Sequence, residues 1–575
     1  MRIGLLTEGG YPYVGGDAGL WCDRLVRGLA QHEFDVYALS RGRQQEAAGR
    51  SPLPPQVGRV RTAPLWKAED DGVAHGRRAR RRFTECYGEL VEALSGGPGA
   101  ASGSAAGPGA APQTDRFGNA LYGLAELARD EGGLVGALRS DTALRTLERA
   151  CRAPGAPRTA REARVADLLT VTAHLERALR PLSLDWYGDD GLGAADLCHA
   201  TAGGTAALPG LLARHLCGVP LLVTEYGVQL RSHYLALGPD TAAPAVRALL
   251  AAFHGLLATE VYRRATFLTP GNAHARRWQE RCGADRARIR TVHPGMDASC
   301  FAEAGESPDR ADPYTLGWVG RVEPAKDLVS LLHAFAEVRR EEPKARLRIV
   351  GTPAGPEGEA YLGHCRVLAA QLFPDEAEGV HAVGDNPVSF EEIGGPEVPT
   401  LPDAYAGAAV VVLSSVVEGF PNTLVEAMFS GRVTVSTDVG AVVEVIGGTG
   451  LVVPPRNPRA LAEACVALLR DPERRERLGA AARARALELF TVEQNIAAFN
   501  GIYLEIVSRC PVRRIALDET GDPLPFAAPA ETHVPVHWTG TTARGRTREA
   551  SGRASGDPVR ATSGAAWGAA SEGAL

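Results

Sequence analysis

Two glutamates that could bind hydroxyl groups lie in the segment Glu418-Gly419-Phe420-Pro421-Asn422-Thr423-Leu424-Val425-Glu426, directly after the apolar run 409–413. In a doubly wound sheet, loops at the carboxyl ends of strands face the ligand crevice, and a helix beginning near Pro421 directs its free N–H groups there. Carboxylates so placed accept hydrogen bonds from sugar or ribose hydroxyls, and the amides of 420–423 can meet a phosphate. Without this context, two glutamates on one helix face are most often a solvated surface.

Two cations follow another apolar run, 314–319, in the segment Gly320-Arg321-Val322-Glu323-Pro324-Ala325-Lys326. Gly320 permits close approach of the backbone to a ligand. Arg321 and Lys326 can neutralise a diphosphate, including the charge that builds on a leaving group. Basic residues after a strand are often only a solvated turn, but Lys326 is one of three lysines among 62 basic residues, which favours function.

The elements that must position these residues form two series of short apolar runs with helical patterns between them. The first series comprises residues 2–8, 35–39, 195–200, 220–224, 266–269 and 289–292, and the second comprises 314–319, 346–350, 380–383, 409–413, 433–436 and 451–453. Such alternation is typical of parallel sheets covered by helices on both faces. We therefore predict an α/β fold with two doubly wound, Rossmann-like domains that face a crevice.

Composition shifts predict the domain boundaries. The first domain should cover residues 1–300 and the second 301–490, because residues 298–312 are rich in Gly, Pro, Asp and Glu. A terminal helix at 491–510 is placed to cross back to the first domain.

Three further segments stand apart from the strand rhythm. Residues 96–112 are almost entirely Gly, Ala, Ser and Pro, which predicts a flexible loop. Residues 117–179 carry helical patterns alone, which predicts a helical insertion in the first domain. The Pro-, Gly-, Ser- and Arg-rich segment 511–575 is predicted to be a disordered tail.

Composition also narrows the class of protein. The formal charge of the 575-residue chain is −6, so no global field attracts nucleic acid. Ten scattered cysteines without a C-x-x-C pair suit a reducing cytoplasm and give no metal-ligand spacing. The most apolar stretch, 408–417, is far shorter than the roughly 20 residues that span a membrane. We expect a cytoplasmic protein without a membrane segment.

These motifs together resemble the donor site of retaining glycosyltransferases of family 4, which use nucleotide sugars and have the two-Rossmann architecture called GT-B. The resemblance covers roughly residues 1–508 and is strongest in the second domain. Gly15-Gly16 and Pro294-Gly295-Met296-Asp297 resemble further landmarks of the family. The segments Glu8-Gly9-Gly10-Tyr11-Pro12-Tyr13-Val14-Gly15-Gly16 and Thr224-Glu225-Tyr226-Gly227-Val228-Gln229-Leu230-Arg231 resemble the branch of Pel exopolysaccharide synthesis.

The resemblance implies a role for each matching residue. Arg321 and Lys326 would hold the donor diphosphate, Glu426 the ribose, and Glu418 the transferred sugar. The implied catalytic residues are Arg321, Lys326 and Glu418, and the implied donor-binding residues are Gly16, Gly320, Phe420, Pro421, Asn422, Thr423 and Glu426. The acceptor-side candidates are His199, Glu225, Tyr226 and Arg231, of which Tyr226 stands where the branch tends to have histidine.

The expected function is transfer of a sugar from a nucleotide diphosphate sugar to an acceptor hydroxyl with retention, in polysaccharide or glycoconjugate synthesis. The absence of an Asp-x-Asp pair favours metal independence, and no cofactor is expected beyond the substrate, for which a uridine donor is the family-weighted choice. The expected partners are a carbohydrate or lipid-linked acceptor and a membrane-associated synthesis complex. The alternatives are a nucleotide-sugar epimerase and a non-catalytic nucleotide-sugar-binding subunit.

The arginine cluster within residues 77–82 allows two interpretations. It is most often a solvated helix face, and contact with an anionic acceptor or a membrane surface is the alternative.

Overall fold

The computed structural model describes residues 1–13, 17–47, 49–66, 69–96, 112–238, 241–306, 312–374 and 386–511. All described residues belong to one compact unit. Gly16, the strand expected at 380–383, all but the two end residues of the loop 96–112, and the tail after Pro511 lie outside the described residues.

The first sheet has six parallel strands in the order β3-β2-β1-β4-β5-β6. Its strands are β1 (Arg2–Glu8), β2 (Glu33–Ser40), β3 (Val57–Pro64), β4 (Leu197–Ala200), β5 (Leu221–Glu225) and β6 (Phe267–Pro270). The strand predicted at 289–292 is wrong: this segment forms only an isolated bridge between Ile289 and Leu268 of β6. Strand β3 was not predicted from the sequence. It lies at the edge of the sheet, and its sequence, VGRVRTAP, contains arginine, glycine and proline in place of a continuous apolar run.

The second sheet repeats the same parallel order, β12-β11-β10-β7-β8-β9. Its strands are β7 (Thr315–Val319), β8 (Arg346–Val350), β9 (Val388–Glu391), β10 (Val410–Leu413), β11 (Val433–Thr437) and β12 (Leu451–Val453). Two Rossmann-like domains, as predicted from the sequence, are therefore confirmed.

Side-chain alternation along the strands builds a separate core on each face of the first sheet. Ile3 and Leu5 of β1 pack with α1 (Asp17–Gly28) and α21 (Val492–Arg509), the last described helix of the chain. Leu6 instead belongs to the core formed with the helices between β3 and β6. Those helices are α3 (Arg77–Ser95), α4 (Gln113–Glu131), α5 (Leu134–Leu138), α6 (Asp141–Arg152), α7 (Arg158–Arg161), α8 (Val165–Ala178), α9 (Leu208–Cys217), α10 (Gln229–Ala236) and α11 (Pro244–Arg264).

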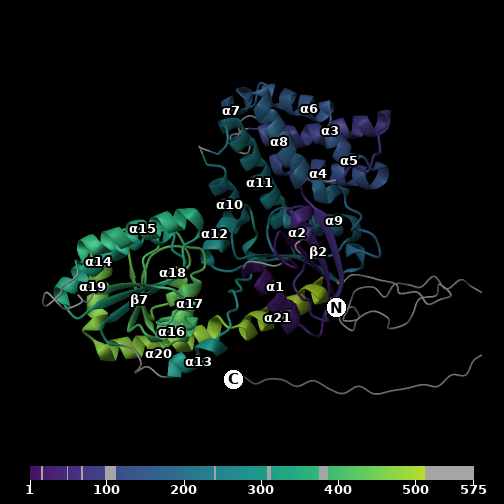
Figure 1. The fold of residues 1–575 in the computed structure, drawn as a ribbon. Coiled ribbons are helices and arrows are strands. Elements are labelled where there is room, and N and C mark those ends of the chain that lie inside the picture. Colours follow the sequence, from purple (N-terminus) through teal and green to yellow (C-terminus); the bar gives the residue numbers. More distant parts are fainter. Residues whose placement is uncertain are drawn as a thin grey trace, which may run out of the picture. The chain divides into compact units, whose positions relative to one another are not determined.

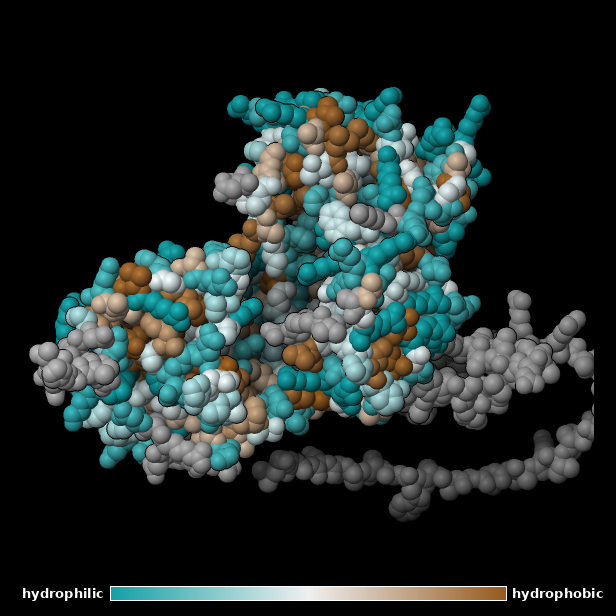
Figure 2. Space-filling view, in the orientation of Figure 1, coloured by the Kyte–Doolittle hydropathy of each residue, from teal (hydrophilic) through white to brown (hydrophobic). Residues whose placement is uncertain are grey.

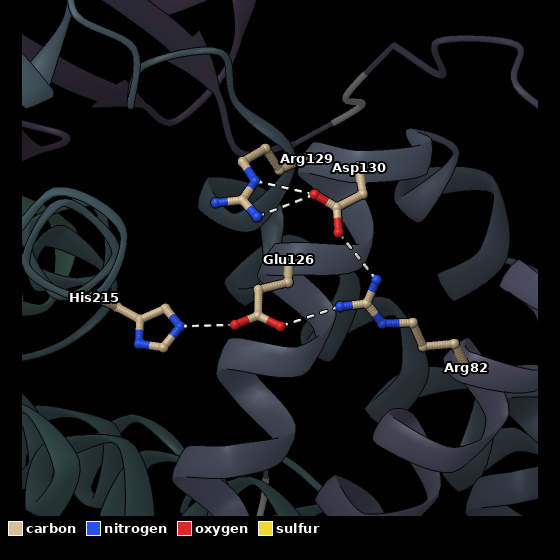
Figure 3. A network of polar contacts seen from close by, with 5 residues as sticks. All are labelled: Arg82, Glu126, Arg129, Asp130 and His215. Carbon is tan, nitrogen blue, oxygen red and sulfur yellow. Dashed lines mark hydrogen bonds and ion pairs between the residues drawn. The ribbon is translucent and has the colours of Figure 1, made fainter.

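Figure 1 shows α3, α4, α5, α6 and α8 gathered into one bundle, which we call the insertion bundle. A polar network ties this bundle to α9 (Figure 3). Glu126 of α4 accepts hydrogen bonds from Arg82 of α3 at 3.1 Å and pairs with His215 of α9 at 3.0 Å, while Asp130 pairs with Arg82 and Arg129. The arginines of the 77–82 cluster thus include one, Arg82, that serves the packing of the bundle.

The second sheet is also covered on both faces, and Figure 1 shows its helices around β7. One face packs against α14 (Leu328–Glu341), α15 (Gly355–Leu372) and α19 (Pro458–Leu469). The other packs against α16 (Leu401–Ala406), α17 (Asn422–Phe429), α18 (Val442–Ile446) and α20 (Pro472–Leu489). The remaining described α-helices are α2 (Arg43–Ala47), α12 (Ala273–Arg281) and α13 (Ala302–Glu306).

Among the described helices, α11 is long and apolar enough to cross a membrane. The sequence analysis did not identify this helix as a candidate. Its buried residues Leu249, Leu250, Phe253 and Leu257 belong to the core of the first domain. On the face drawn in Figure 2, hydrophobic residues form small separate patches within a mostly hydrophilic surface. The apolarity of α11 is thus accounted for by packing inside this domain.

Candidate functional site

Each sheet has a point where the strand order reverses, between β1 and β4 in the first and between β7 and β10 in the second. In open α/β sheets, ligands bind beside the carboxyl ends of the strands at this switch point. The segments 320–326 and 414–421 follow β7 and β10 directly. The two groups of residues singled out from the sequence therefore flank the switch point of the second sheet.

Hydrogen bonds fasten these two loops to each other. Ser414 Oγ donates to the carbonyl of Lys326 at 2.7 Å, and the amide of Val416 donates to the carbonyl of Ala325 at 2.9 Å. On its other side the β7 loop is held through the amide of Val322, which donates to the carbonyl of Thr352 at 2.9 Å. The backbone that carries the two candidate cations is thus fixed on both sides.

The loops bring together Lys326 and Glu418, which stand 92 residues apart in the chain. Lys326 Nζ donates to Glu418 Oε1 at 2.5 Å, and Ser415 Oγ donates to the same oxygen at 2.7 Å. The two side chains are only 15% and 9% exposed. An ammonium has three N–H donors, so the bond to Glu418 leaves two for a ligand.

Arg321 is exposed and follows Gly320 in the same loop that carries Lys326. Gly320 has a φ of 156°, a conformation that side chains disfavour, and a Cβ there would stand 3.4 Å from the ring of Trp318. The site therefore presents an exposed guanidinium, together with an ammonium and a carboxylate that hold each other in an ion pair. This set can neutralise a diphosphate and accept hydrogen bonds from hydroxyls.

Glu426 lies in helix α17, where the hydroxyl of Tyr405 donates to its Oε2 at 2.5 Å. Burial, followed by the neighbouring Glu426 charge, raises the pKa of Tyr405 well above its ordinary value. The tyrosine therefore stays protonated at neutral pH and orients the carboxylate as a donor.

The backbone donors at the start of α17 are fewer than expected from the sequence. Pro421 has no N–H, and the amide of Asn422 donates to the carbonyl of Phe420 at 3.1 Å. The prediction that Asn422 offers a free amide is therefore wrong, because a tight turn at Pro421 uses it. Among the described residues of this turn, the amides of Phe420 and Thr423 are the ones left for a ligand.

His199, an acceptor-side candidate, is completely buried. Its Nδ1 lies 2.7 Å from the hydroxyl of Tyr503 in α21, and its Nε2 lies 2.6 Å from Thr224 Oγ1. Burial lowers the pKa of His199 to about 3, so the ring is neutral. This position gives His199 no surface toward an acceptor and makes it a packing residue between the first sheet and α21.

Glu225 is buried as well, with every carboxylate oxygen engaged. Gln229 N donates to Oε1 at 3.0 Å, while Tyr262 and Gln279 donate to Oε2 at 2.7 and 3.1 Å. Burial raises the pKa of Glu225. A carboxylate held in this way shapes the loop after β5, and no oxygen is left for an acceptor.

The other two acceptor-side candidates are half-buried. The hydroxyl of Tyr226 accepts a hydrogen bond from Asn495 Nδ2 of α21 at 2.8 Å, and its ring contacts Trp21 edge to face. Arg231 lies in the first turn of α10. The structure thus separates His199 and Glu225, which are internal, from Tyr226 and Arg231, which keep some exposed surface.

Two residues that hold the candidate site were missed at the sequence level. Ser415 lies within the apolar stretch 408–417, and the available signal was its position three residues before Glu418, to which it donates a hydrogen bond. Tyr405 gives no local signal, because it meets Glu426 across 21 residues of chain.

The two Rossmann-like sheets define the architectural class of this protein. A solved structure with a similar fold supports this classification. A sucrose-phosphate synthase from Thermosynechococcus elongatus is similar over 88% of this chain and 99% of its own, with a TM-score of 0.50 and 17% identity. At that identity the likeness shows a shared fold.

Sequence comparison relates the two domains to different families. Residues 313–471 match the family described as glycosyl transferases group 1, and residues 1–287 match a domain of unknown function, DUF3492. A D-inositol 3-phosphate glycosyltransferase from Kineococcus radiotolerans is 35% identical over 223 residues, which are 36% of this chain and 49% of that protein. One from Nocardioides is 31% identical over 311 residues, 51% and 64% of the respective chains. The chain thus spans about half to two-thirds of these relatives.

Proposed function

We propose that this protein is a glycosyltransferase that moves a sugar from a nucleotide diphosphate sugar to an acceptor hydroxyl with retention of configuration. The observation that carries the proposal is the Lys326–Glu418 pair at the switch point of the second sheet, with Arg321 in the same loop as Lys326. The similarity of residues 313–471 to group 1 glycosyl transferases supports it independently. Retention rests on the resemblance of the donor motifs to family 4.

In the proposed mechanism, the residues bind and orient the donor while the bond from the sugar to the diphosphate breaks. Arg321 and Lys326 neutralise the charge that develops on the departing diphosphate, the task that a divalent metal performs elsewhere. Glu418, held by Lys326 and Ser415, accepts hydrogen bonds from the transferred sugar. Glu426, oriented by Tyr405, binds the ribose. The acceptor oxygen then forms the new bond, and its proton leaves with the diphosphate.

The surroundings of the reaction are part of the proposal. The acceptor would be a carbohydrate or a lipid-linked carbohydrate, and the setting a cytoplasmic step of polysaccharide synthesis, in line with the resemblance to the Pel branch. The ten cysteines, all free in the structure, agree with a reducing compartment. The name of the relatives adds D-inositol 3-phosphate as an acceptor to test.

The test combines nucleotide binding with turnover. Titration calorimetry with uridine and guanosine diphosphates identifies the base, and incubation with the matching nucleotide sugars measures transfer or slow hydrolysis. Arg321→Ala and Lys326→Ala should each cost on the order of 2–4 kcal/mol of transition-state stabilisation, because each removes a cation that meets developing charge.

Matched controls lie in the same domain. Lys344 and Arg340 are exposed residues away from the two loops, and Lys344→Ala and Arg340→Ala should leave turnover unchanged. Wild-type rates in the Arg321 and Lys326 variants would contradict the proposal. An epimerised sugar still attached to its nucleotide would instead identify an epimerase, and binding without turnover a non-catalytic subunit.

A further inference from the structure

A second group of polar side chains gathers at the switch point of the first sheet. Glu8 is the last residue of β1, the strand that borders the reversal of strand order. Alternation along β1 places Glu8 on the same face as Leu6, which packs in the core shared with the insertion bundle. By the same alternation Arg41, directly after β2, follows Tyr37 and Leu39 of that core.

Helix α8 of the insertion bundle contributes a cation and an imidazole to this group. The guanidinium of Arg177 lies 4.4 Å above the ring of Trp66, and His174 meets the same ring edge to face at 6.1 Å. Arg177 is close enough to Glu8 for its charge to counteract the rise in the pKa of Glu8 that burial causes. Trp66 itself is 44% exposed, so the group reaches the surface.

Helices α10 and α11 add two stacked histidines, which lie close enough to Arg177 for its charge to lower the pKa of both rings in addition to the effect of burial. The rings of His233 and His254 lie 3.5 Å apart and nearly parallel. Burial lowers the pKa of His233 to about 4 and that of His254 to about 3, so both rings are neutral at pH 7. A neutral imidazole offers one donor and one acceptor, which suits hydroxyl groups.

Several polar atoms of this group lack partners that a packing role would supply. Glu8 Oε2 and His233 Nε2 are buried without a hydrogen bond among the described residues. No ion pair within the described part of the chain joins Glu8 to Arg41 or Arg177, although the three charges influence one another. Buried polar atoms are nearly always satisfied in folded proteins, so unsatisfied ones call for a ligand or water.

Glu225 of the neighbouring strand β5 shows the opposite case. Both of its oxygens are engaged by protein donors, as expected of a carboxylate that serves packing alone. Glu8 lies at the switch point with one oxygen unused. Two arginines against one glutamate also leave this group with a net positive charge.

We propose that Glu8, Arg41, Arg177 and the His233–His254 pair form an acceptor subsite that binds a carbohydrate carrying an anionic group, phosphate or carboxylate. Arg41 and Arg177 pair with the anionic group, while Glu8 and the histidines hydrogen-bond to hydroxyls. The assignment of this ligand as an acceptor rests on the proposed function. Its recognition as an anionic carbohydrate rests only on the residues of the group.

The test measures binding of defined probes to the full chain without any donor. Glucose 6-phosphate and glucuronate carry the two anionic groups, and glucose is the neutral counterpart. We expect at least one anionic probe to bind about 10-fold more tightly than glucose, with the preference falling as salt increases. The stronger of the two anionic probes tells phosphate from carboxylate recognition.

Variants locate the binding. Arg177→Gln should weaken binding of the anionic probe about 10-fold. Arg177→Lys should recover part of this affinity, because it restores the positive charge without the planar guanidinium that can form two parallel hydrogen bonds. Arg145→Gln, which changes an exposed arginine of α6, is the matched control and should bind like the wild type. Melting curves confirm that each variant is folded.

Three results would overturn the subsite: equal affinity for charged and neutral probes, no binding of any probe at millimolar concentration, or an Arg177→Gln variant that binds like Arg145→Gln. Titration with uridine and guanosine diphosphates, done on the same samples, tests the donor site separately. If the full chain bound neither nucleotide but kept its preference for the anionic probes, the proposed function would be contradicted while the anion-binding site would still be supported.

Discussion

At the scale of single residues, the partners of a side chain decide its role more than its type does. Glu418 and Glu225 are both carboxylates with little exposed surface. Glu418 forms an ion pair with Lys326 at a switch point, whereas Glu225 accepts hydrogen bonds from neutral donors only. A lysine in an ion pair keeps N–H donors that can bind a ligand, whereas a carboxylate whose oxygens both accept hydrogen bonds from the protein has no free acceptor for a ligand. This difference separates the candidate site from its surroundings.

The buried neutral histidines predict how stability depends on pH. Burial lowers the pKa of His199 from 6.5 to about 3, so between these values the unfolded chain binds a proton that the folded chain does not. The neutral ring of His199 therefore makes its whole contribution to the free energy of unfolding above pH 6.5. This contribution decreases as the pH falls, by up to about 1.4 kcal/mol per pH unit.

The measurement is chemical unfolding of the wild type and His199→Gln at several pH values. The stability difference between them should be constant above pH 6.5 and shrink steadily from pH 6 to pH 4. His364→Gln, at an exposed position of α15, should run parallel to the wild type throughout. Parallel curves for His199→Gln would show that His199 is charged or accessible in the folded protein.

At the scale of elements, the loop that carries Glu418 depends on the turn after β11. Gly440 has a φ of +57°, and a Cβ there would stand 2.5 Å from the carbonyl oxygen of Glu418. The amide of Ala441 donates to the carbonyl of Gly419 at 3.1 Å, so the two loops support each other. Gly440→Ala should displace the Glu418 loop and cost about 1–3 kcal/mol of stability.

Urea unfolding and nucleotide titration test this together, since the displaced loop should also weaken nucleotide-sugar binding. Gly363→Ala is the control, because that helical glycine of α15 faces open space and alanine there should stabilise by about 0.5–1 kcal/mol. If Gly440→Ala kept wild-type stability and affinity, the two loops would be independent.

The sequence predicts the elements of this protein better than their contacts. The alternation of short apolar runs with helical patterns was enough to predict two parallel sheets, and the position of Lys326 and Glu418 directly after two of these runs placed both at the crevice edge of the second sheet. The edge strand β3 was missed because one side is solvated and its composition resembles a loop. Tyr405 and Arg177 could not be found, since Tyr405 bonds Glu426 and Arg177 contacts Trp66 from distant parts of the chain.

At the scale of the whole molecule, the end of the described chain completes the domain at its beginning. Phe499, Tyr503 and Ile506 of α21 are fully buried in the core that includes Ile3 and Leu5 of β1. Polar contacts add to this packing: Trp21 Nε1 donates to Asn495 Oδ1 at 3.2 Å, and Tyr503 bonds His199. The first domain is therefore incomplete until the chain has passed through the second.

Shortened chains test this dependence. A chain that ends at Phe490 loses several fully buried side chains, each worth about 1.5–3 kcal/mol, which together approach the whole stability of a domain. We expect it to aggregate or to show a first domain sensitive to proteases, whereas a chain that ends at Pro511 keeps α21 and should fold. Ile506→Ala in the full chain gives the graded version, with a loss of about 2–5 kcal/mol. If the chain ending at Phe490 melted like the longer one, α21 would be an accessory to the first domain, and the two domains would fold independently.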